Sequence, residues 1–195
     1  PCLENEYITF GSCNNLAKLT PKVIKVWARI LQAVPHTKLL LKAKALGDKA
    51  VRNRLINAFT NESIDKERLI LRSWITKKSP LSIYNEIDIA LDPFPYNGTT
   101  TLCETLWMGV PTIVLEGRRH SARVGHSLNS QVGLQGWTAP DIDGYVTLAT
   151  LRANDVSNLR RIRESVRDQM KNSSLCDGLA FTARLELAYA KMCKN

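Results

Sequence analysis

A run of three threonines, with an acidic residue one turn later, is the densest group of chemically useful side chains in this sequence. Threonine hydroxyls at a helix start cap free backbone N–H groups. A helix start after a glycine-bearing loop favours an anion, because the N–H groups and the helix dipole point at it. Glu104 lies one turn beyond Thr100, within reach of a sugar hydroxyl. The segment therefore indicates a site for a nucleotide diphosphate, with the candidate residues Asn97, Gly98, Thr99, Thr100, Thr101 and Glu104.

The same pattern also has a plainer interpretation. Capped helices follow glycine loops in most α/β domains, and an acid in the first turn complements the helix dipole without any ligand. The sequence has no Lys directly after a glycine loop, as a P-loop needs, and no G-x-G-x-x-G. These features argue against a P-loop ATPase and against an ordinary dinucleotide-binding enzyme.

Segments with strand-like and helix-like patterns alternate along the chain and must position these residues. Apolar runs predict strands at 7–10, 38–41, 69–71, 87–91 and 112–115. Helices are predicted at 21–34, 48–59, 81–84 and 121–130, and from the threonine run onward. Strands alternating with helices indicate an α/β fold, a Rossmann-like parallel sheet with helices on both faces. Apolar stripes at 155–170 and 181–192 predict that the domain ends in two helices.

Three loops of this expected sheet qualify as parts of one site. In open parallel sheets, ligands bind beyond the carboxyl ends of the strands. Segments 11–18, 72–79 and 92–101 each follow an expected strand. Their convergence is the strongest argument from the residues alone for a single shared site.

Composition indicates one globular domain over residues 1–195, with 44% hydrophobic residues and no apolar run near the ~20 residues of a membrane span. The five cysteines are an odd number and widely spaced, without C-x-x-C, so neither a metal site nor a disulfide framework is expected. A reducing, cytoplasmic setting fits this usage best. Because the sequence begins at Pro1, we expect it to be a fragment of a longer protein.

The positive charge of the chain is uneven. Residues 1–80 hold 15 Lys and Arg against 6 Asp and Glu, a net charge of +9, whereas residues 81–195 hold 12 of each. The basic half is suited to attract a polyanion or the phosphates of a nucleotide; the alternative is a set of solvated helix faces. No basic run interleaved with aromatic residues is present, so nucleic acid is not an expected partner.

The segment 87–101, IDIALDPFPYNGTTT, resembles the O-GlcNAc transferase / Spindly family of glycosyltransferases. The likeness is strongest to bacterial members with tetratricopeptide repeats. It continues through 104–111, 121–125 and 10–21, and it includes 174–177 near the end of the chain. The resemblance therefore covers nearly the whole chain, with a long motif at fixed spacing.

This resemblance implies the C-terminal, donor-binding half of a glycosyltransferase-B fold, which has two Rossmann-like halves with a cleft between them. Family members move N-acetylglucosamine from UDP-GlcNAc, or fucose from GDP-fucose, to Ser or Thr of proteins. They invert the anomeric centre and use neither a metal nor a cofactor. The partners implied are a nucleotide-sugar donor and a protein acceptor held by the other half and the repeats, with no role for a membrane.

Residue by residue, the resemblance places Lys18 on the diphosphate as the catalytic cation, with Asn15 nearby. A positioned cation stabilises negative charge on a departing nucleoside diphosphate. Thr99, Thr100 and Thr101 would hold the phosphates and the sugar. The plainer interpretation of Lys18 is a solvated loop lysine.

The sequence differs from the family pattern mainly at residues expected to line the nucleoside pocket. Lys77 would line it, although a surface charge beside Lys78 is the equal alternative. Pro80 stands where the family has a base-stacking His, which puts base choice and affinity in question. Glu104 would bind the ribose hydroxyls, where animal enzymes carry Asp, and Asn15 replaces a Gln of animal members. His120 either faces the cleft or occupies an ordinary loop position.

Tryptophans at helical spacing are expected in the core. This prediction applies to Trp27, Trp74 and Trp107, and Trp137 is left open. His36, which follows Pro35, is expected at the surface.

Four functions follow from these observations. The leading one is the donor-nucleotide half of a protein O-glycosyltransferase, and the isolated chain is expected to bind nucleotide without transferring sugar. A sugar-nucleotide epimerase would place more carboxylates and histidines near the diphosphate. A non-catalytic interaction module is supported mainly by Pro80, and a nucleic-acid-binding domain by the charge of +9 alone.

Overall fold

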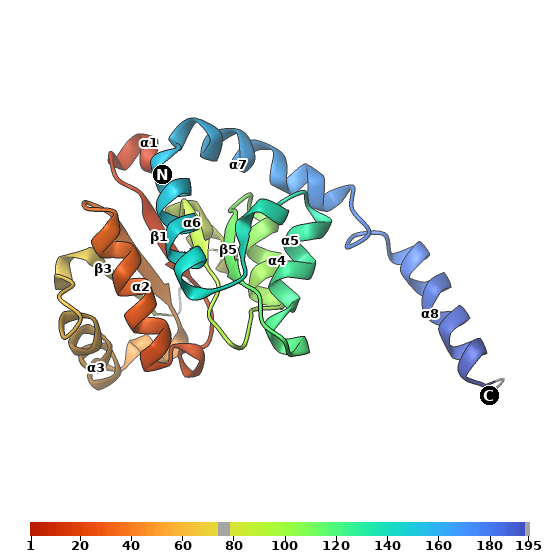
Figure 1. The fold of residues 1–195 in the computed structure, drawn as a ribbon, viewed down its shortest axis with the longest axis horizontal. Helices are drawn as coiled ribbons and strands as arrows, with labels where there is room; N and C mark the ends of the chain where they lie inside the picture. The colour runs from red at the N-terminus through yellow and green to blue at the C-terminus, as the bar shows by residue number, and fades with distance from the viewer. Residues whose placement is uncertain (74–78, 194–195) are drawn as a thin grey trace.

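A computed structural model describes residues 1–73 and 79–193 of the chain (Figure 1). Its centre is a six-stranded sheet in the order β3-β2-β1-β4-β5-β6, in which all neighbouring strands run parallel. The strands are β1 Thr9–Ser12, β2 Lys38–Lys42, β3 Leu69–Arg72, β4 Ile89–Leu91, β5 Thr112–Leu115 and β6 Thr138–Ala139. The predicted Rossmann-like parallel sheet is thus confirmed.

Helices connect the strands. The α-helices are α1 Cys2–Asn5, α2 Pro21–Ala33, α3 Lys49–Thr60, α4 Thr100–Trp107, α5 Val124–Gln131, α6 Ile142–Asn154, α7 Val156–Lys171 and α8 Gly178–Met192. Short 3-10 helices are η1 Leu16–Lys18, η2 Lys44–Gly47, η3 Lys66–Arg68, η4 Pro80–Glu86, η5 His120–Ala122 and η6 Gln135–Trp137. No helix in the described ranges is both long and apolar enough to cross a membrane.

The sheet is buried on both faces, as β2 illustrates. Leu39 and Leu41 belong to the larger apolar cluster, with α2, α3 and α6, whereas Leu40 between them belongs to a smaller cluster that includes Tyr84 of η4. Successive side chains of a strand point to opposite faces. The two clusters therefore mark the two faces, and helical segments cover each of them.

Helix α2 follows directly from its sequence. The Thr20 hydroxyl accepts a hydrogen bond from the Val23 N–H, and Pro21 occupies the first turn. The predicted stripe faces the sheet, because Val23, Val26, Trp27, Ile30, Leu31 and Val34 are all buried. The expected core position of Trp27 is therefore confirmed.

Three details of the expected element pattern were wrong. The first strand is β1 at Thr9–Ser12, two residues later than expected, because pairing with β2 and β4 extends beyond the apolar residues. The short helix α1 was not expected. The pair β6 and α6 was also not expected, because α6 buries Tyr145 and the small residues Ala149 and Ala153, which leave a weak apolar stripe.

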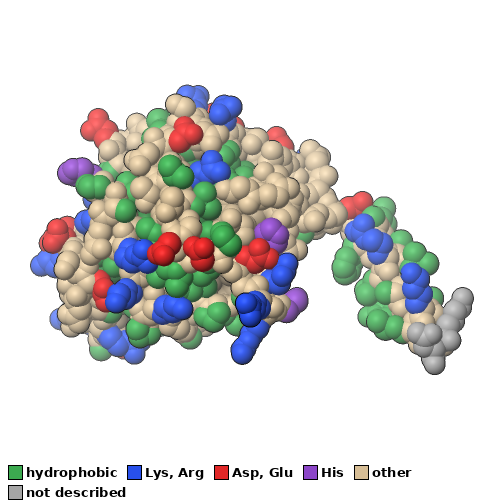
Figure 2. Space-filling view, viewed as in Figure 1, with side chains coloured by type: hydrophobic (Ala, Val, Ile, Leu, Met, Phe, Trp, Pro, Cys, Tyr) green, Lys and Arg blue, Asp and Glu red, His purple; other side chains and the backbone are tan. Residues whose placement is uncertain are grey.

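The two terminal helices are both present, but they differ in packing. Leu159, Val166 and Met170 bury one face of α7, which packs on α4 and α6. Helix α8 instead extends away from the body of the domain (Figure 1), and none of its residues is buried. Figure 2 shows hydrophobic side chains gathered along this isolated helix. Its apolar stripe is thus real, but no other described element covers it.

Candidate active site at the switch point of the sheet

The candidate residues gather where the strand order reverses, between β1 and β4. Such a switch point leaves a crevice beyond the carboxyl ends of the two strands, where open α/β sheets bind ligands. The loops after β1 and β4 meet there, as the expected convergence requires. The third loop is incomplete: residues 74–78, which include Trp74, Lys77 and Lys78, lie outside the described residues.

Lys18, at the end of η1, joins the two loops. Its ammonium nitrogen donates to the backbone carbonyl of Asn97 at 2.8 Å and to Asn14 Oδ1 at 3.3 Å. It also lies 4.4 Å from the centroid of the Tyr96 ring. Partial burial lowers the pKa of Lys18, and the nearby Asp92 opposes that shift. The side chain is therefore held in the crevice, unlike a freely solvated loop lysine.

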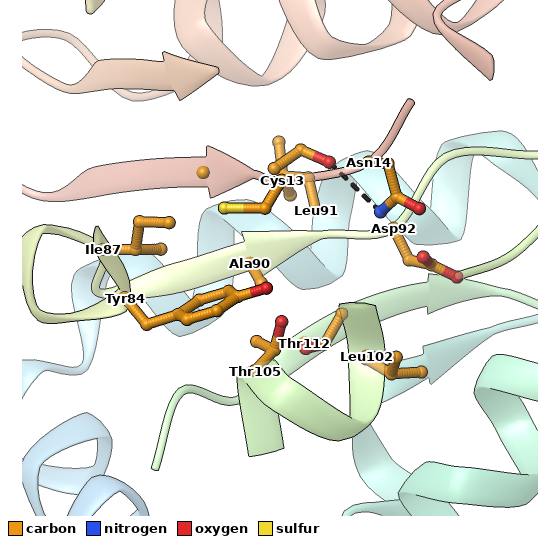
Figure 3. A pocket seen from close by; sticks show the side chains of 12 residues that line it. Cys13, Asn14, Tyr84, Ile87, Ala90, Leu91, Asp92, Leu102, Thr105 and Thr112 are labelled. Atoms are coloured by element: carbon orange, nitrogen blue, oxygen red, sulfur yellow. Dashed lines mark hydrogen bonds between the residues drawn. The ribbon is translucent and has the colours of Figure 1, made fainter. Parts of the chain in front are cut away.

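Asn14 is a site residue that the sequence analysis missed. It is buried, and its Oδ1 also accepts a hydrogen bond from the Thr101 hydroxyl at 3.1 Å. Its amide donates to Ser12 Oγ at 3.4 Å, the dashed contact in Figure 3. One amide group therefore connects β1, Lys18 and the first turn of α4.

Asp92 is a second missed residue, directly after β4. Its side chain is 2% exposed, and Oδ1 accepts the Gly98 N–H at 2.8 Å. Burial raises the pKa of Asp92 to about 7, against the lowering effects of the Gly98 N–H and the Lys18 ammonium. An isolated charged carboxylate is costly to bury. The positive charge of the nearby Lys18 offsets part of that cost.

Asn97 and Gly98 shape the loop after β4 from within. The buried Asn97 side chain donates to the Pro93 carbonyl at 3.3 Å and accepts the Gly125 N–H at 3.2 Å. Gly98 has no room for a side chain, since a Cβ there would lie 2.5 Å from Thr101 Oγ1. In this structure both residues position the loop against α5 and α4.

The three threonines begin α4 as expected, but the predicted hydroxyl capping is wrong. Thr99, at the N-cap, makes no side-chain cap bond and has φ −113° and ψ −77°. This differs from the extended backbone of a typical N-cap. The Thr101 hydroxyl is directed to Asn14 instead. Thr99 and Thr100 are exposed at the helix start.

Glu104 lies one turn into α4 and is half-buried. Its Oε2 accepts a hydrogen bond from the Tyr84 hydroxyl at 3.0 Å. This contact links α4 to η4, which begins at the exposed Pro80. The Pro80 carbonyl accepts a bond from the Lys42 ammonium at 3.2 Å. The expected ribose and base residues thus stand on two elements that are bonded to each other.

Asn15 is exposed and caps η1, because its Oδ1 accepts the Ala17 N–H at 2.9 Å. It also lines an open groove of about 650 Å³ with Cys13, Asn14 and Leu16 after β1, with Lys42 at the end of β2 and with Lys44 of η2. A second recess of about 370 Å³ lies beside Lys18 and is lined by Phe94, Pro95 and Tyr96. Both volumes lie within the range of small-molecule sites.

The remaining aromatic and histidine residues differ in burial. His36 is exposed, as expected, and His120 is exposed at the start of η5. Trp107 is half-buried against the core and has the Arg167 guanidinium 4.9 Å from its ring centroid. Trp137, whose place the sequence did not decide, is buried. In residues 1–73 and 79–193, no three His, Cys, Asp or Glu side chains are grouped to hold a metal ion.

Sequence comparison places this chain among glycosyltransferases. Residues 2–185 match the profile of glycosyl transferase family 41. The chain is 46% identical over 193 residues to the probable UDP-N-acetylglucosamine–peptide N-acetylglucosaminyltransferase SPINDLY of Petunia hybrida, and 44% identical over 196 residues to that of Arabidopsis thaliana. These matches cover 98% and 100% of the chain but 21% of each relative. The chain therefore spans about a fifth of the length of these curated relatives.

Solved structures agree with this placement. A mutant O-GlcNAc transferase of Thermobaculum terrenum superposes with a TM-score of 0.90 at 39% identity, over 95% of this chain and 36% of that one. Anabaena HepE, in complex with UDP and glucose, superposes with a TM-score of 0.66 at 10% identity, over 97% of this chain and 51% of that one. The second match shows a shared fold only. Together with the family profile, these findings establish that the chain belongs to glycosyl transferase family 41.

Proposed function

We propose that this chain is the donor-nucleotide-binding part of a protein O-glycosyltransferase, which moves N-acetylglucosamine from UDP-GlcNAc to Ser or Thr side chains of proteins. The observation that carries the proposal is the position of Lys18. Its ammonium is fixed between the loops after β1 and β4, beside the first turn of α4. A cation next to a helix N-terminus favours a diphosphate.

The chemistry that this arrangement supports is departure of the nucleoside diphosphate. Negative charge grows on the diphosphate as the bond between the anomeric carbon and its phosphate oxygen breaks. Lys18 and the first N–H groups of α4 would stabilise that charge. We therefore propose a transfer without a metal, in which the acceptor hydroxyl attacks the opposite face of the sugar and inverts the anomeric centre.

The acceptor and its general base would come from parts of the protein outside this chain. The residues that we assign to the donor come from one sheet only. We therefore propose that the isolated chain binds nucleotide but transfers no sugar, and that tetratricopeptide repeats and a second Rossmann-like half hold the protein substrate. We further propose a cytoplasmic, bacterial protein; its five free cysteines suit a reducing compartment.

Calorimetric titration of the purified protein with UDP, GDP and ADP tests this proposal. We expect UDP to bind, and the variants K18A and E104Q to weaken that binding. Lys25 is exposed on α2; K25A is therefore the matched control for loss of a positive charge. Robust sugar transfer to a peptide by the isolated chain would contradict the proposal that the acceptor-binding residues and the general base lie outside it.

The choice of nucleotide separates the alternatives. A preference for GDP would replace the UDP-GlcNAc interpretation by a GDP-fucose-dependent transferase. Binding of none of the three would favour a non-catalytic interaction module, with Pro80 as the change that removed base stacking. Equal affinity of the K18A variant and the wild type for UDP would contradict the assigned diphosphate site.

A further inference from the structure

Tyr84, which is not among the predicted site residues, donates a hydrogen bond to the candidate residue Glu104. The Tyr84 hydroxyl lies 3.0 Å from Glu104 Oε2 and connects η4 to α4. Tyr84 is 20 residues before Glu104 in the chain, so no local motif predicts the pair. The contact fixes a carboxylate that the proposed function places on the donor's ribose.

Tyr84 is a rigid donor. Its side chain is 1% exposed and packs in the smaller apolar cluster with Ile83, Ile87 and Val110. Figure 3 shows the ring directed from η4 toward Ala90 and Thr105. Its backbone carbonyl accepts the Arg163 guanidinium of α7 at 3.1 Å. The ring therefore has little freedom to leave Glu104.

The hydroxyl also keeps its proton. Burial raises the pKa of Tyr84 far above its ordinary value, and the negative charge of the nearby Glu104 acts in the same direction. The protonated hydroxyl can donate to the Glu104 carboxylate at 3.0 Å, and the Thr101 carbonyl is a longer alternative acceptor at 3.4 Å. One Glu104 oxygen is thus held in place without a second charge.

Glu104 retains capacity for a ligand in this arrangement. An ionised carboxylate has about four acceptor positions on its two oxygens. The Tyr84 hydroxyl occupies one of them, and Glu104 as a residue is only half-buried. The two hydroxyls of a ribose are donors of the kind that such a fixed carboxylate recognises.

Resting on the proposed function, we propose that Tyr84 is a positioning residue for ribose recognition: it aims the Glu104 carboxylate at the sugar hydroxyls of the bound nucleoside diphosphate. Tyr84 and Pro80 stand on the same 3-10 helix. Base contact and ribose contact are therefore set by one element. Lys18, on the loop after β1, bonds to Asn14 and Asn97 and makes no direct hydrogen bond to Tyr84.

The test is calorimetric titration of wild type and Y84F with UDP, 2′,3′-dideoxy-UDP and inorganic pyrophosphate. We expect wild type to prefer UDP to the dideoxy compound by about tenfold or more, the range of a hydrogen bond to a charged group. Y84F should lose most of that preference, with pyrophosphate affinity unchanged. Y7F, at the amino-terminal edge of the sheet, is the matched control and should behave as wild type.

The outcomes separate this inference from the proposed function. Failure of wild type to bind UDP or pyrophosphate overturns the proposed function and the inference with it. Wild-type preference for UDP that persists in Y84F overturns the inference alone. A Y84F protein that loses pyrophosphate binding as well shows a general structural role for the hydroxyl and also overturns it. In the double variant Y84F/E104Q, the inference requires no further loss beyond E104Q.

Discussion

The Lys18 ammonium and the Asn97 carbonyl, 2.8 Å apart, join two loops that are 79 residues apart in the chain. The bond crosses the switch point of the sheet and brings a cation to the start of α4. A diphosphate bound there would meet a charge that is already in place. The loops after β1 and β4 are therefore joined into one surface.

Replacement of Lys18 by alanine removes both the cation and this connection. We expect K18A to weaken UDP binding by at least about tenfold, since hydrogen bonds to charged groups contribute about 1.5–3 kcal/mol. Isothermal titration calorimetry measures the change. K25A, on the exposed face of α2, should bind UDP as wild type does. Similar affinities for K18A and K25A would refute the assignment.

Asp92 makes folding stability depend on pH. Burial raises its pKa from 3.8 to about 7 in the folded chain. The folded state therefore binds this proton more tightly than the unfolded state. The stability that this proton supplies is complete below about pH 4 and is lost as the pH rises through about 7.

The variant D92N isolates this effect, because its amide oxygen can still accept the Gly98 N–H and carries no titrating proton. Wild type should lose stability relative to D92N as the pH rises from 4 to 8. We expect the difference between their free energies of unfolding to shift in favour of D92N by at most on the order of 4 kcal/mol. Urea unfolding at several pH values measures this difference. Parallel pH profiles for the two proteins would contradict the prediction.

Gly98 occupies a position that excludes a methyl group. A Cβ would lie 2.5 Å from Thr101 Oγ1 and 3.0 Å from Asp92 Oδ1. We expect G98A to force the Thr101 hydroxyl away from Asn14, to lower stability by about 1–3 kcal/mol, and to weaken UDP binding. Thermal unfolding and titration measure the two effects.

Gly178, the first residue of α8, supplies the matched control because a Cβ added there would meet nothing within 4 Å. G178A should leave UDP binding unchanged and should not lower stability, since alanine is the better helix former. Equal effects of G98A and G178A would show that the tight packing around Gly98 has no consequence.

Tyr145 connects the core to the loop after β4. Its hydroxyl accepts the Trp27 indole N–H at 3.2 Å and donates to the Asp92 carbonyl at 3.1 Å. Y145F leaves a fully buried indole N–H without this partner, so we expect a loss of about 1–3 kcal/mol. Denaturant unfolding measures it. Y7F is the control for loss of a hydroxyl, and an equal cost in both variants would contradict the argument.

Local patterns in the sequence predicted most of the fold. The Thr20 cap, the α2 stripe and the short apolar strands are signals contained in a few neighbouring residues, and all of them are present in the structure. Helix α6 was missed because alanines carry part of its buried face. The spacing of Tyr145, Ala149 and Ala153, every fourth residue after the capping Asp141, is the signal that was available.

The candidate site was predicted less completely than the fold, for a different reason. Lys18, Gly98 and the threonines lie in recognisable loops, but their partners Asn14 and Asp92 are buried polar residues without a local pattern. Their roles depend on contacts across the sheet, such as Thr101 to Asn14 over 87 positions. The capping prediction for the threonines was wrong because the backbone of Thr99, at the N-cap, is not extended, and because the Thr101 hydroxyl bonds to the distant Asn14.

We expect helix α8 to unfold independently of the rest of the domain. It has 15 residues and none of them is buried, and isolated helices of this length are marginal in water. We expect the amide hydrogens of α8 to exchange with deuterium long before those of β1 and β4, because exchange in α8 requires only local opening of that helix. Slow exchange along α8 would report that another surface covers the row of apolar side chains that Figure 2 shows exposed.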